Sequence, residues 1–133
     1  MYNGSCHCGK CRYEISGEPI RFAFCHCHDC RKFHGTAFNS AILVNTSDFK
    51  LTQGQDQIGT YESSPGSFRH FCRNCGCHLF KTMTARPAVT IVSVGRLDGD
   101  HGLKPQMHIW VSAKAPWYEI RDDLPQFQEG YKA

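Results

Sequence analysis

The feature that most constrains this chain is its set of nine cysteines, gathered in three groups of three along 133 residues. The groups are Cys6, Cys8 and Cys11, then Cys25, Cys27 and Cys30, then Cys72, Cys75 and Cys77. An odd number cannot all pair internally as disulfides, and the first residues lack the basic and apolar stretches of an export signal. We therefore expect a cytoplasmic protein with reduced thiols, in which metal binding is the common reason for so many cysteines.

The spacing within the first and third groups predicts one shared metal site. Cys6 and Cys8 are two residues apart, so on an extended segment both sulfurs point to the same face. Cys72 and Cys75 form a C-x-x-C turn of the kind that curls around zinc. A glycine directly follows each pair and allows the backbone to turn sharply. Together these four thiolates are predicted to hold a structural zinc in a tetrahedral site.

The middle group, Cys25, Cys27 and Cys30, is built differently, because an arginine rather than a glycine follows it. Three protein ligands and a vacant fourth position are typical of a catalytic zinc, so the sequence predicts two zinc ions per chain. Two alternatives stay open. A histidine (His26, His28 or His34) could complete a purely structural site, or the thiols could act as redox sensors without metal. Cys11 and Cys77 are left over, and we expect them to be small buried apolar side chains near the structural ion.

Charge and hydropathy argue against two other classes of function, nucleic-acid binding and membrane spanning. The formal net charge is only +3, and the basic residues are scattered, which argues against a nucleic-acid partner. The most apolar stretch, residues 88–94, is far too short to cross a bilayer. The oligomeric state cannot be read from the sequence.

Hydrophobic alternation predicts a single all-β domain over residues 1–133. Short runs rich in aromatic and β-branched residues indicate strands at 12–15, 21–24, 38–44, 68–71, 78–81, 89–97 and 108–111. Residues 49–51 and 59–61 are expected to pair as a hairpin across the polar turn at 53–56. Helical turns are expected only at 28–34 and after Asp98.

These motifs resemble those of the glutathione-dependent formaldehyde-activating enzyme family, also called the CENP-V/GFA family. The resemblance rests on residues 6–9, 25–31 and 71–76, and on a later pattern at 105–110 with Pro116 and Trp117. It implies an Mss4-like zinc-binding β-sandwich or ribbon with short helical turns. It also implies the same division of ligands, with a structural zinc on Cys6, Cys8, Cys72 and Cys75 and a catalytic zinc on Cys25, Cys27 and Cys30.

A zinc ion held by three thiolates predicts a carbon–sulfur lyase. Because three thiolates on Zn²⁺ leave the complex with a net charge of −1, the ion acidifies water poorly and is better suited to binding a substrate thiolate that attacks a carbonyl carbon. The expected partner is a small thiol such as glutathione, joined to an aldehyde such as formaldehyde. Four basic residues near the motifs are candidates for binding substrate carboxylates: Arg31, Lys32, Arg69 and Lys114. Each can also be read as a solvated surface charge.

Other side chains near the motifs have two readings each. His26 and His28 could shuttle protons or lie away from the sulfurs, and Trp110 and Trp117 could line a pocket or pack in the core. The alternative function is a non-catalytic zinc-ribbon module that binds a protein or chromatin. A concave pocket beside the middle group favours the enzyme.

Overall fold

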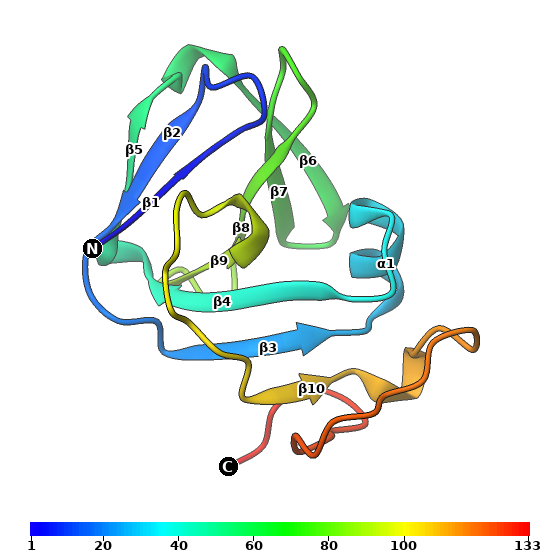
Figure 1. Ribbon diagram of the computed structural model, residues 1–133. Coiled ribbons are helices and arrows are strands. Elements are labelled where there is room, and N and C mark those ends of the chain that lie inside the picture. The colour runs from blue at the N-terminus through cyan, green and yellow to red at the C-terminus, as the bar shows by residue number, and fades with distance from the viewer. The chain divides into compact units, whose positions relative to one another are not determined.

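The computed structural model describes all residues from 1 to 133, and strands dominate it (Figure 1). Ten β-strands accompany one α-helix and four short 3-10 helices. The prediction of an all-β fold is thereby confirmed. The chain forms two compact units, each described separately below: residues 1–20 with 42–102, and residues 21–41 with 103–133. Whether the chain acts as a single domain stays a prediction.

A three-stranded antiparallel sheet lies in the first unit, in the order β1–β2–β5. Its strands are β1 (Tyr2–Ser5), β2 (Arg12–Ile15) and β5 (Phe49–Gln53). Along β2, Tyr13 and Ile15 are buried while Arg12 is exposed, the alternation expected of a strand with one covered face. Gly4 pairs with Tyr13, whose ring occupies the space that a larger side chain on Gly4 would need.

The first unit also contains an antiparallel run of four strands in the order β9–β8–β7–β6. Pro65 and Gly66 form the turn between β6 and β7, and Gly66 has the positive φ of 78° that glycine adopts readily. Leu79 on β8 and Val92 on β9 are fully buried in its core. The strands are β6 (Ile58–Ser64), β7 (Ser67–Cys72), β8 (His78–Met83) and β9 (Val89–Ser93).

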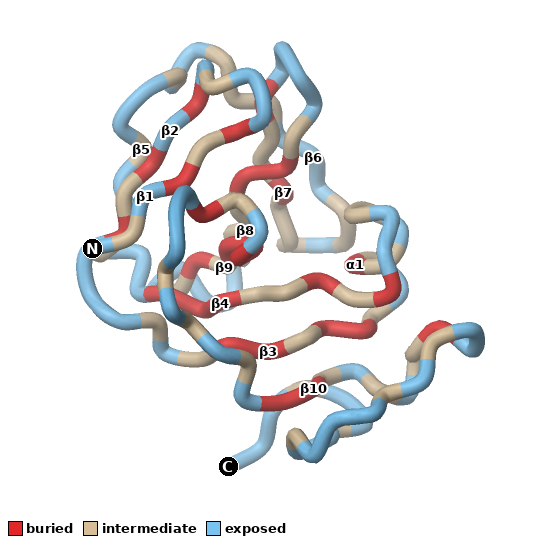
Figure 2. The backbone as a smooth tube through the Cα atoms, viewed as in Figure 1, coloured by how far each residue is buried: buried red, intermediate tan, exposed pale blue.

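The second unit is built on a parallel pair, β3 (Arg21–Cys25) and β10 (Met107–Ile109), with the helix α1 (His28–His34) following β3. Residues after Ile109 contain little regular structure and are mostly exposed or half-buried, whereas β3 and β10 carry buried residues (Figure 2). Backbone bonds fold the segment back on itself, because the amide of Phe127 donates to the carbonyl of His108. Strand β4 (Asn39–Asn45) carries the chain from this unit into the other.

Several boundaries differ from the predictions. The hairpin expected between 49–51 and 59–61 is wrong, because β5 pairs with β2 and β6 pairs with β7. Gly54, in the left-handed region, leads into a 3-10 helix at Gln55–Gln57 that redirects the chain. The strand predicted over 89–97 ends at Ser93, where a 3-10 helix begins, and the stretch after Asp98 is not helical. None of the helices has the length and apolarity needed to span a bilayer.

Candidate functional site

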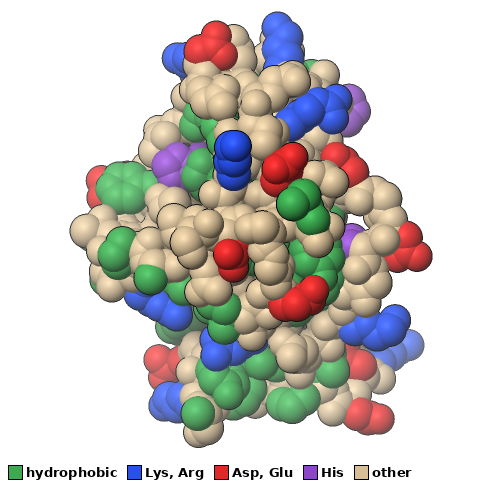
Figure 3. All heavy atoms as spheres, turned by 90° about the vertical axis from the view of Figure 1, so that its left-hand side faces the viewer, with side chains coloured by type: hydrophobic (Ala, Val, Ile, Leu, Met, Phe, Trp, Pro, Cys, Tyr) green, Lys and Arg blue, Asp and Glu red, His purple; other side chains and the backbone are tan.

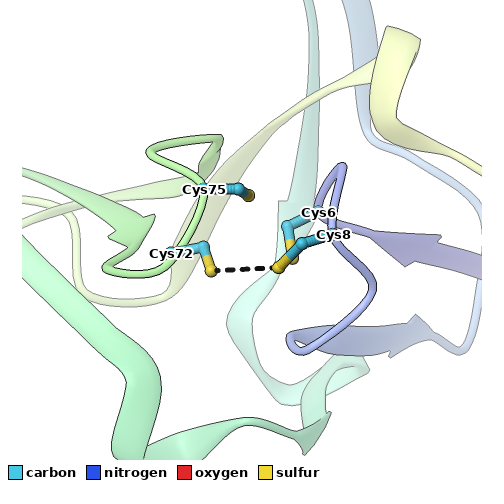
Figure 4. Close-up of side chains that lie close together, drawn as sticks. All are labelled: Cys6, Cys8, Cys72 and Cys75. Carbon is cyan, nitrogen blue, oxygen red and sulfur yellow. Dashed lines mark hydrogen bonds between the residues drawn. The ribbon is translucent and has the colours of Figure 1, made fainter.

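Four cysteine sulfurs converge in the first unit. Cys6 and Cys8 lie on the loop after β1 and face Cys72, the last residue of β7, and Cys75 on the turn that follows (Figure 4). The four sulfurs lie within 4.8 Å of one another, with Cys6 and Cys8 3.6 Å apart and Cys8 and Cys72 3.8 Å apart. The structure therefore brings together the four residues that the spacing assigned to one site, in a geometry that could hold a metal ion.

The two loops that supply these sulfurs have matching backbone turns. The amide of Gly9 donates to the carbonyl of Cys6 at 3.1 Å, and the amide of Gly76 donates to the carbonyl of Cys72 at 2.8 Å. Both glycines have positive φ, at 80° and 78°, a conformation that a residue with a Cβ adopts rarely. The glycine after each cysteine pair is thus required by the turn, as the sequence indicated.

Hydrogen bonds in this group favour thiolates. The side chain of Asn74 is the main cause that lowers the pKa of Cys8 to about 6. The amide of Cys11 donates to the sulfur of Cys6 at 3.3 Å. Burial by contrast raises the pKa of Cys75. Four thiols this close cannot all ionise without a cation to neutralise them, so the donor set fits a metal such as zinc.

Three further sulfurs converge in the second unit. Cys25 ends β3, Cys27 is the N-cap of α1, and Cys30 lies in the first turn of that helix. Their sulfurs lie within 4.8 Å of one another, and the amide of Cys30 donates to the sulfur of Cys27 at 3.3 Å. Hydrogen bonding to its two neighbours, with burial, raises the pKa of Cys25 far above its usual range. This group too requires a cation before all three can be thiolates.

The three-sulfur group contains no histidine. His26, His28 and His34, any of which could have supplied a fourth ligand, are not part of it. Of these, His26 faces a different set of residues, since its ring lies 5.1 Å from that of Phe38 and 5.0 Å from that of His108. The donor set is therefore three thiolates, which fits a metal ion with a position left for a further ligand.

Sequence reasoning missed a hydrogen-bonded row of three polar side chains in this unit, made of two buried histidines and one exposed aspartate. Nε2 of His26 lies 2.8 Å from Nδ1 of His108, and Nε2 of His108 lies 2.9 Å from a carboxylate oxygen of Asp122. Both histidines have no exposed surface. Burial, and then the charges of His108, Lys114 and Arg31, lower the pKa of His26 to about 4. The partners lie 82 and 14 residues apart, and no local pattern in the sequence signals their contact.

The direction of the hydrogen bonds between His26, His108 and Asp122 follows from the carboxylate of Asp122. A carboxylate accepts only, so Nε2–H of His108 donates to Asp122, which leaves Nδ1 of His108 to accept from Nε2–H of His26. The remaining nitrogen of His26, Nδ1, is then an acceptor, and it is buried without a hydrogen-bond partner. The hydrogen bonds to His108 and Asp122 thus hold His26 in one tautomer and orientation. His26 stands between Cys25 and Cys27 in the sequence.

The cations proposed from sequence for substrate carboxylates fall in different places. Arg69 belongs to the first unit and is 2% exposed, with Nε donating to Ser63, so it is no solvated surface charge. Lys32 is exposed on α1. Arg31 follows Cys30, and its guanidinium donates to the carbonyl of Ala113 at 3.0 Å. Lys114 lies next in the chain after that carbonyl.

Lys114 and Trp117 line an open pocket in the second unit, formed by residues between 114 and 126 and about 550 Å³ in volume. Trp117 is 70% exposed, so the core-packing reading of this side chain is wrong. Trp110 is half-exposed and has a φ of 57°, making it the single non-glycine residue with positive φ. Backbone strain of this kind is common at functional sites.

The face drawn in Figure 3 carries no large patch of basic side chains. On the face drawn in Figure 3, basic and acidic side chains are interspersed, and neither sign gathers into a large patch. The net charge of +3 agrees with this distribution.

Comparisons with known proteins connect these groups to a family. The family model described as glutathione-dependent formaldehyde-activating enzyme matches residues 1–113. Over 126 residues the chain is 21% identical to an uncharacterised lyase of Schizosaccharomyces pombe, covering 95% of this chain and 90% of that protein. A crystal structure of a Rhodobacter sphaeroides protein matches with a TM-score of 0.62 and 26% identity, covering 74% of this chain and 90% of that one.

Two longer fungal proteins are also similar. Those of Phaeosphaeria nodorum and Pyrenophora teres f. teres are 27% and 26% identical over 126 residues, and both carry the provisional name glutathione-dependent formaldehyde-activating enzyme. In each case 92% of this chain is matched, but the chain spans only 56% of the relative's length.

Proposed function

The chain belongs to the glutathione-dependent formaldehyde-activating enzyme family, and we propose that it is a zinc-dependent carbon–sulfur lyase acting on a small thiol and a small aldehyde. The observation that carries this proposal is the convergence of three sulfurs, from Cys25, Cys27 and Cys30, with no histidine in their group. The lyase named in Schizosaccharomyces pombe supports the same class of reaction. The free thiols suit a reducing compartment, and the location we propose is the cytoplasm.

In this proposal the two cysteine groups have separate roles. Cys6, Cys8, Cys72 and Cys75 hold a structural zinc, since four thiolates complete a tetrahedral site and join the loop after β1 to the turn after β7. The middle group holds a second zinc with three ligands. Thiolate sets favour zinc, cuprous copper or iron–sulfur clusters, and the C-x-x-C turn of Cys72 and Cys75 is typical of zinc.

The reaction forms one carbon–sulfur bond. The sulfur of a thiolate attacks the carbonyl carbon of the aldehyde, the π bond of the carbonyl breaks, and its oxygen takes up the proton that the thiol has lost. The reverse reaction splits the same bond and returns thiol and aldehyde. Zinc bound to three thiolates supplies a position that holds a substrate sulfur in its ionised, nucleophilic form.

The chain's own residues prepare this site. The amide of Cys30 donates to the sulfur of Cys27 and helps to hold it as a thiolate. Arg31 follows Cys30 in the chain, and the bond from its guanidinium to the carbonyl of Ala113 fixes the segment that follows β10. Because the uncatalysed addition is already feasible, positioning of thiol and aldehyde is the main contribution asked of the protein.

Cobalt substitution tests the proposal, because cobalt–thiolate charge-transfer bands report each sulfur ligand. Adding 2-mercaptoethanol or glutathione to the cobalt protein should change the band, and Cys27→Ser should abolish that change while preserving the fold. Cys11→Ala, which removes a cysteine outside both groups, is the matched control and should respond like the wild type. If neither thiol changes the band, the middle site is closed and the non-catalytic binding module replaces the enzyme.

Turnover is measured separately. Proton NMR of glutathione mixed with formaldehyde follows the adduct directly, and the wild-type protein should speed its formation and its breakdown alike. If the protein coordinates thiols but accelerates neither direction with any small aldehyde, the thiol-binding metal site stands and the proposed lyase reaction is wrong.

A further inference from the structure

We propose that the hydrogen-bonded row of His26, His108 and Asp122 positions the three-sulfur group of the second unit for its metal ion. In this role His108 on β10 and Asp122 in the segment after it are positioning residues, because neither supplies a sulfur. The inference rests on the part of the proposed function that assigns a zinc ion to the sulfurs of Cys25, Cys27 and Cys30. It adds two residues that lie outside the cysteine motifs.

His26 is the single residue between two of the ligands, and both its backbone and its side chain bond to β10. Its amide donates to the carbonyl of Ile109 at 3.0 Å, and its Nε2 lies 2.8 Å from Nδ1 of His108. The parallel pairing of β3 with β10 ends one residue earlier, at Cys25 and Ile109. His26 therefore extends the hold of β10 beyond the sheet, up to the residue that precedes Cys27.

The orientation of the His26 side chain controls the sulfurs on either side of it. Cys25 ends a β-strand, and Cys27 has the extended backbone angles φ −60° and ψ 154°. Along an extended backbone successive side chains point to opposite faces, so both sulfurs project away from the imidazole. The group of converging sulfurs agrees, since it includes Cys25 and Cys27 and excludes His26. Holding the imidazole on one side therefore turns both sulfurs toward the same ion.

Packing keeps the two imidazole rings in place. His26 and His108 have no exposed surface. The ring of Phe38 lies 5.1 Å from that of His26 and 6.2 Å from that of His108, and the ring of Phe24 lies 5.3 Å from that of His108. Close-packed interiors transmit strain rather than absorb it, so a disturbance at one ring of the row reaches the other.

Asp122 determines which nitrogen of His108 accepts from His26. Its Oδ1 and Oδ2 lie 3.1 Å and 2.9 Å from Nε2 of His108, and Oδ1 also accepts from the amide of Leu124 at 3.0 Å. Without this carboxylate, a neutral His108 can carry its proton on either nitrogen. A proton on Nδ1 would then face the Nε2–H of His26 across the 2.8 Å between the rings. Removing the acceptor at Asp122 thus removes the reason for a single arrangement at His26.

The three-sulfur group needs such support because it lacks the features that shape the four-sulfur group. In the four-sulfur group, Gly9 and Gly76 provide the sharp turns, and a fourth thiolate completes the set of ligands. No glycine follows Cys30, and only three sulfurs converge. With fewer ligands, more of the metal affinity depends on sulfurs that are in place before the ion binds. Groups that orient metal ligands change metal affinity about 10- to 100-fold.

A buried polar row also has a plainer role, which is to stabilise the second unit without any effect on the metal. The two roles differ in the result of a change at Asp122. Its side chain is 40% exposed, so removing it opens no cavity in the core. A loss of zinc affinity at the three-sulfur group, larger than that caused by an equal loss of stability elsewhere in the unit, is expected only from positioning.

The experiment measures zinc release from the two-zinc protein by competition with the chelator pyridylazoresorcinol, and native mass spectrometry counts the ions that remain. Cys27→Ser identifies the release that belongs to the three-sulfur group. Asp122→Ala should raise the zinc dissociation constant of this group about tenfold. Asp122→Asn keeps an oxygen that can accept from His108, so the rise should be only about threefold. Both variants should retain the zinc of the four-sulfur group at the same chelator concentration as the wild type.

Two controls separate positioning from general loosening. Met107→Ala removes a buried apolar side chain from β10, which destabilises the second unit but leaves the row complete. Urea unfolding should show that this variant loses at least as much stability as Asp122→Ala. Asp123→Ala removes the neighbouring exposed carboxylate. Both controls should keep the zinc affinity of the three-sulfur group within about twofold of the wild type.

Three outcomes would overturn the inference: an unchanged zinc dissociation constant in Asp122→Ala, a rise in Asp122→Asn as large as in Asp122→Ala, or an equal rise in Met107→Ala. Each leaves the proposed function standing, because that function is tested by the response of the cobalt band to thiols and does not require the row. A wild-type protein whose three-sulfur group binds no zinc removes the proposed function, and the inference falls with it.

Discussion

Nε2 of His26 lies 2.8 Å from Nδ1 of His108 on β10, and both histidines are completely buried. Asp122 completes this chain at the protein surface, with its carboxylate 2.9 Å from the other nitrogen of His108. These hydrogen bonds therefore connect three stretches of the second unit: His26 directly after β3, His108 on β10, and the exposed segment that contains Asp122.

Replacing His108 should loosen this unit. His108→Phe keeps a ring beside Phe24 but removes both nitrogens, leaving the buried Nε2–H of His26 without an acceptor. A buried donor left unsatisfied costs about 1–3 kcal/mol, so the free energy of unfolding in urea should fall by that amount. Amide exchange should also become faster in residues 110–126.

Asp122→Asn is a milder change in the same group of hydrogen bonds, and its stability should be compared with that of His108→Phe. It keeps the contact between the two histidines and an oxygen that can accept from His108, so its loss of stability should be smaller. If His108→Phe unfolds at the same urea concentration as the wild type, the buried chain does not stabilise this unit.

The groups of cysteines show what spacing alone can predict. The two cysteines of each predicted ligand pair, such as Cys72 and Cys75, are separated by so few residues that a single turn determines where both sulfurs point. Joining Cys6 to Cys72 required only the expectation that four thiolates complete one site, and the structure brings these sulfurs within 4.8 Å. Ligand chemistry thus supplied long-range information that hydrophobic patterning does not.

The hydrogen-bonded chain and the pairing of β5 lay beyond such reasoning. His26 and His108 are 82 residues apart, and nothing in their local sequence distinguishes a buried partner from a surface histidine. Residues 49–51 and 59–61 look like a hairpin because a polar turn separates them. The left-handed Gly54 instead starts a 3-10 helix, and β5 finds its partner in β2. Pairing was decided by tertiary packing, which local composition does not determine.

Metal content should reflect the two groups. Native mass spectrometry of the purified protein should find two zinc ions per chain. Cys72→Ser should give unfolded or insoluble protein, because a structural zinc contributes on the order of 10 kcal/mol to folding, comparable with the whole stability of a small domain. Cys11→Ala should keep both ions, since Cys11 is fully buried but belongs to neither group. A folded Cys72→Ser protein that still carries two ions would contradict the four-sulfur assignment.

Gly4 is a second point at which the first unit should be intolerant of change. A Cβ on Gly4 would lie 2.1 Å from the Cζ atom of Tyr13, in a buried pair between β1 and β2. Gly4→Ala forces that ring to move within a packed core and should cost at least about 1–3 kcal/mol in urea unfolding. Gly95→Ala is the matched control, because no atom lies within 4 Å of its Cβ position and its stability should change little. Equal stability of the two variants would show that the sheet adjusts at no cost.

Tyr13 also predicts how stability depends on alkaline pH. Its side chain is 1% exposed, its hydroxyl has no hydrogen-bond partner, and burial is the main cause that raises its pKa above the usual range. Above pH 10 the unfolded chain therefore loses this proton while the folded chain keeps it, so the free energy of unfolding falls as the pH rises.

Tyr13→Phe removes this dependence and also an unsatisfied buried hydroxyl. The variant should be more stable than the wild type by about 1 kcal/mol at pH 8, and by more at pH 11. Urea unfolding at both values measures the difference, with the exposed Tyr61→Phe expected to follow the wild type throughout. A difference between Tyr13→Phe and the wild type that stays constant from pH 8 to pH 11 would show that the Tyr13 hydroxyl ionises as readily in the folded chain as in the unfolded one.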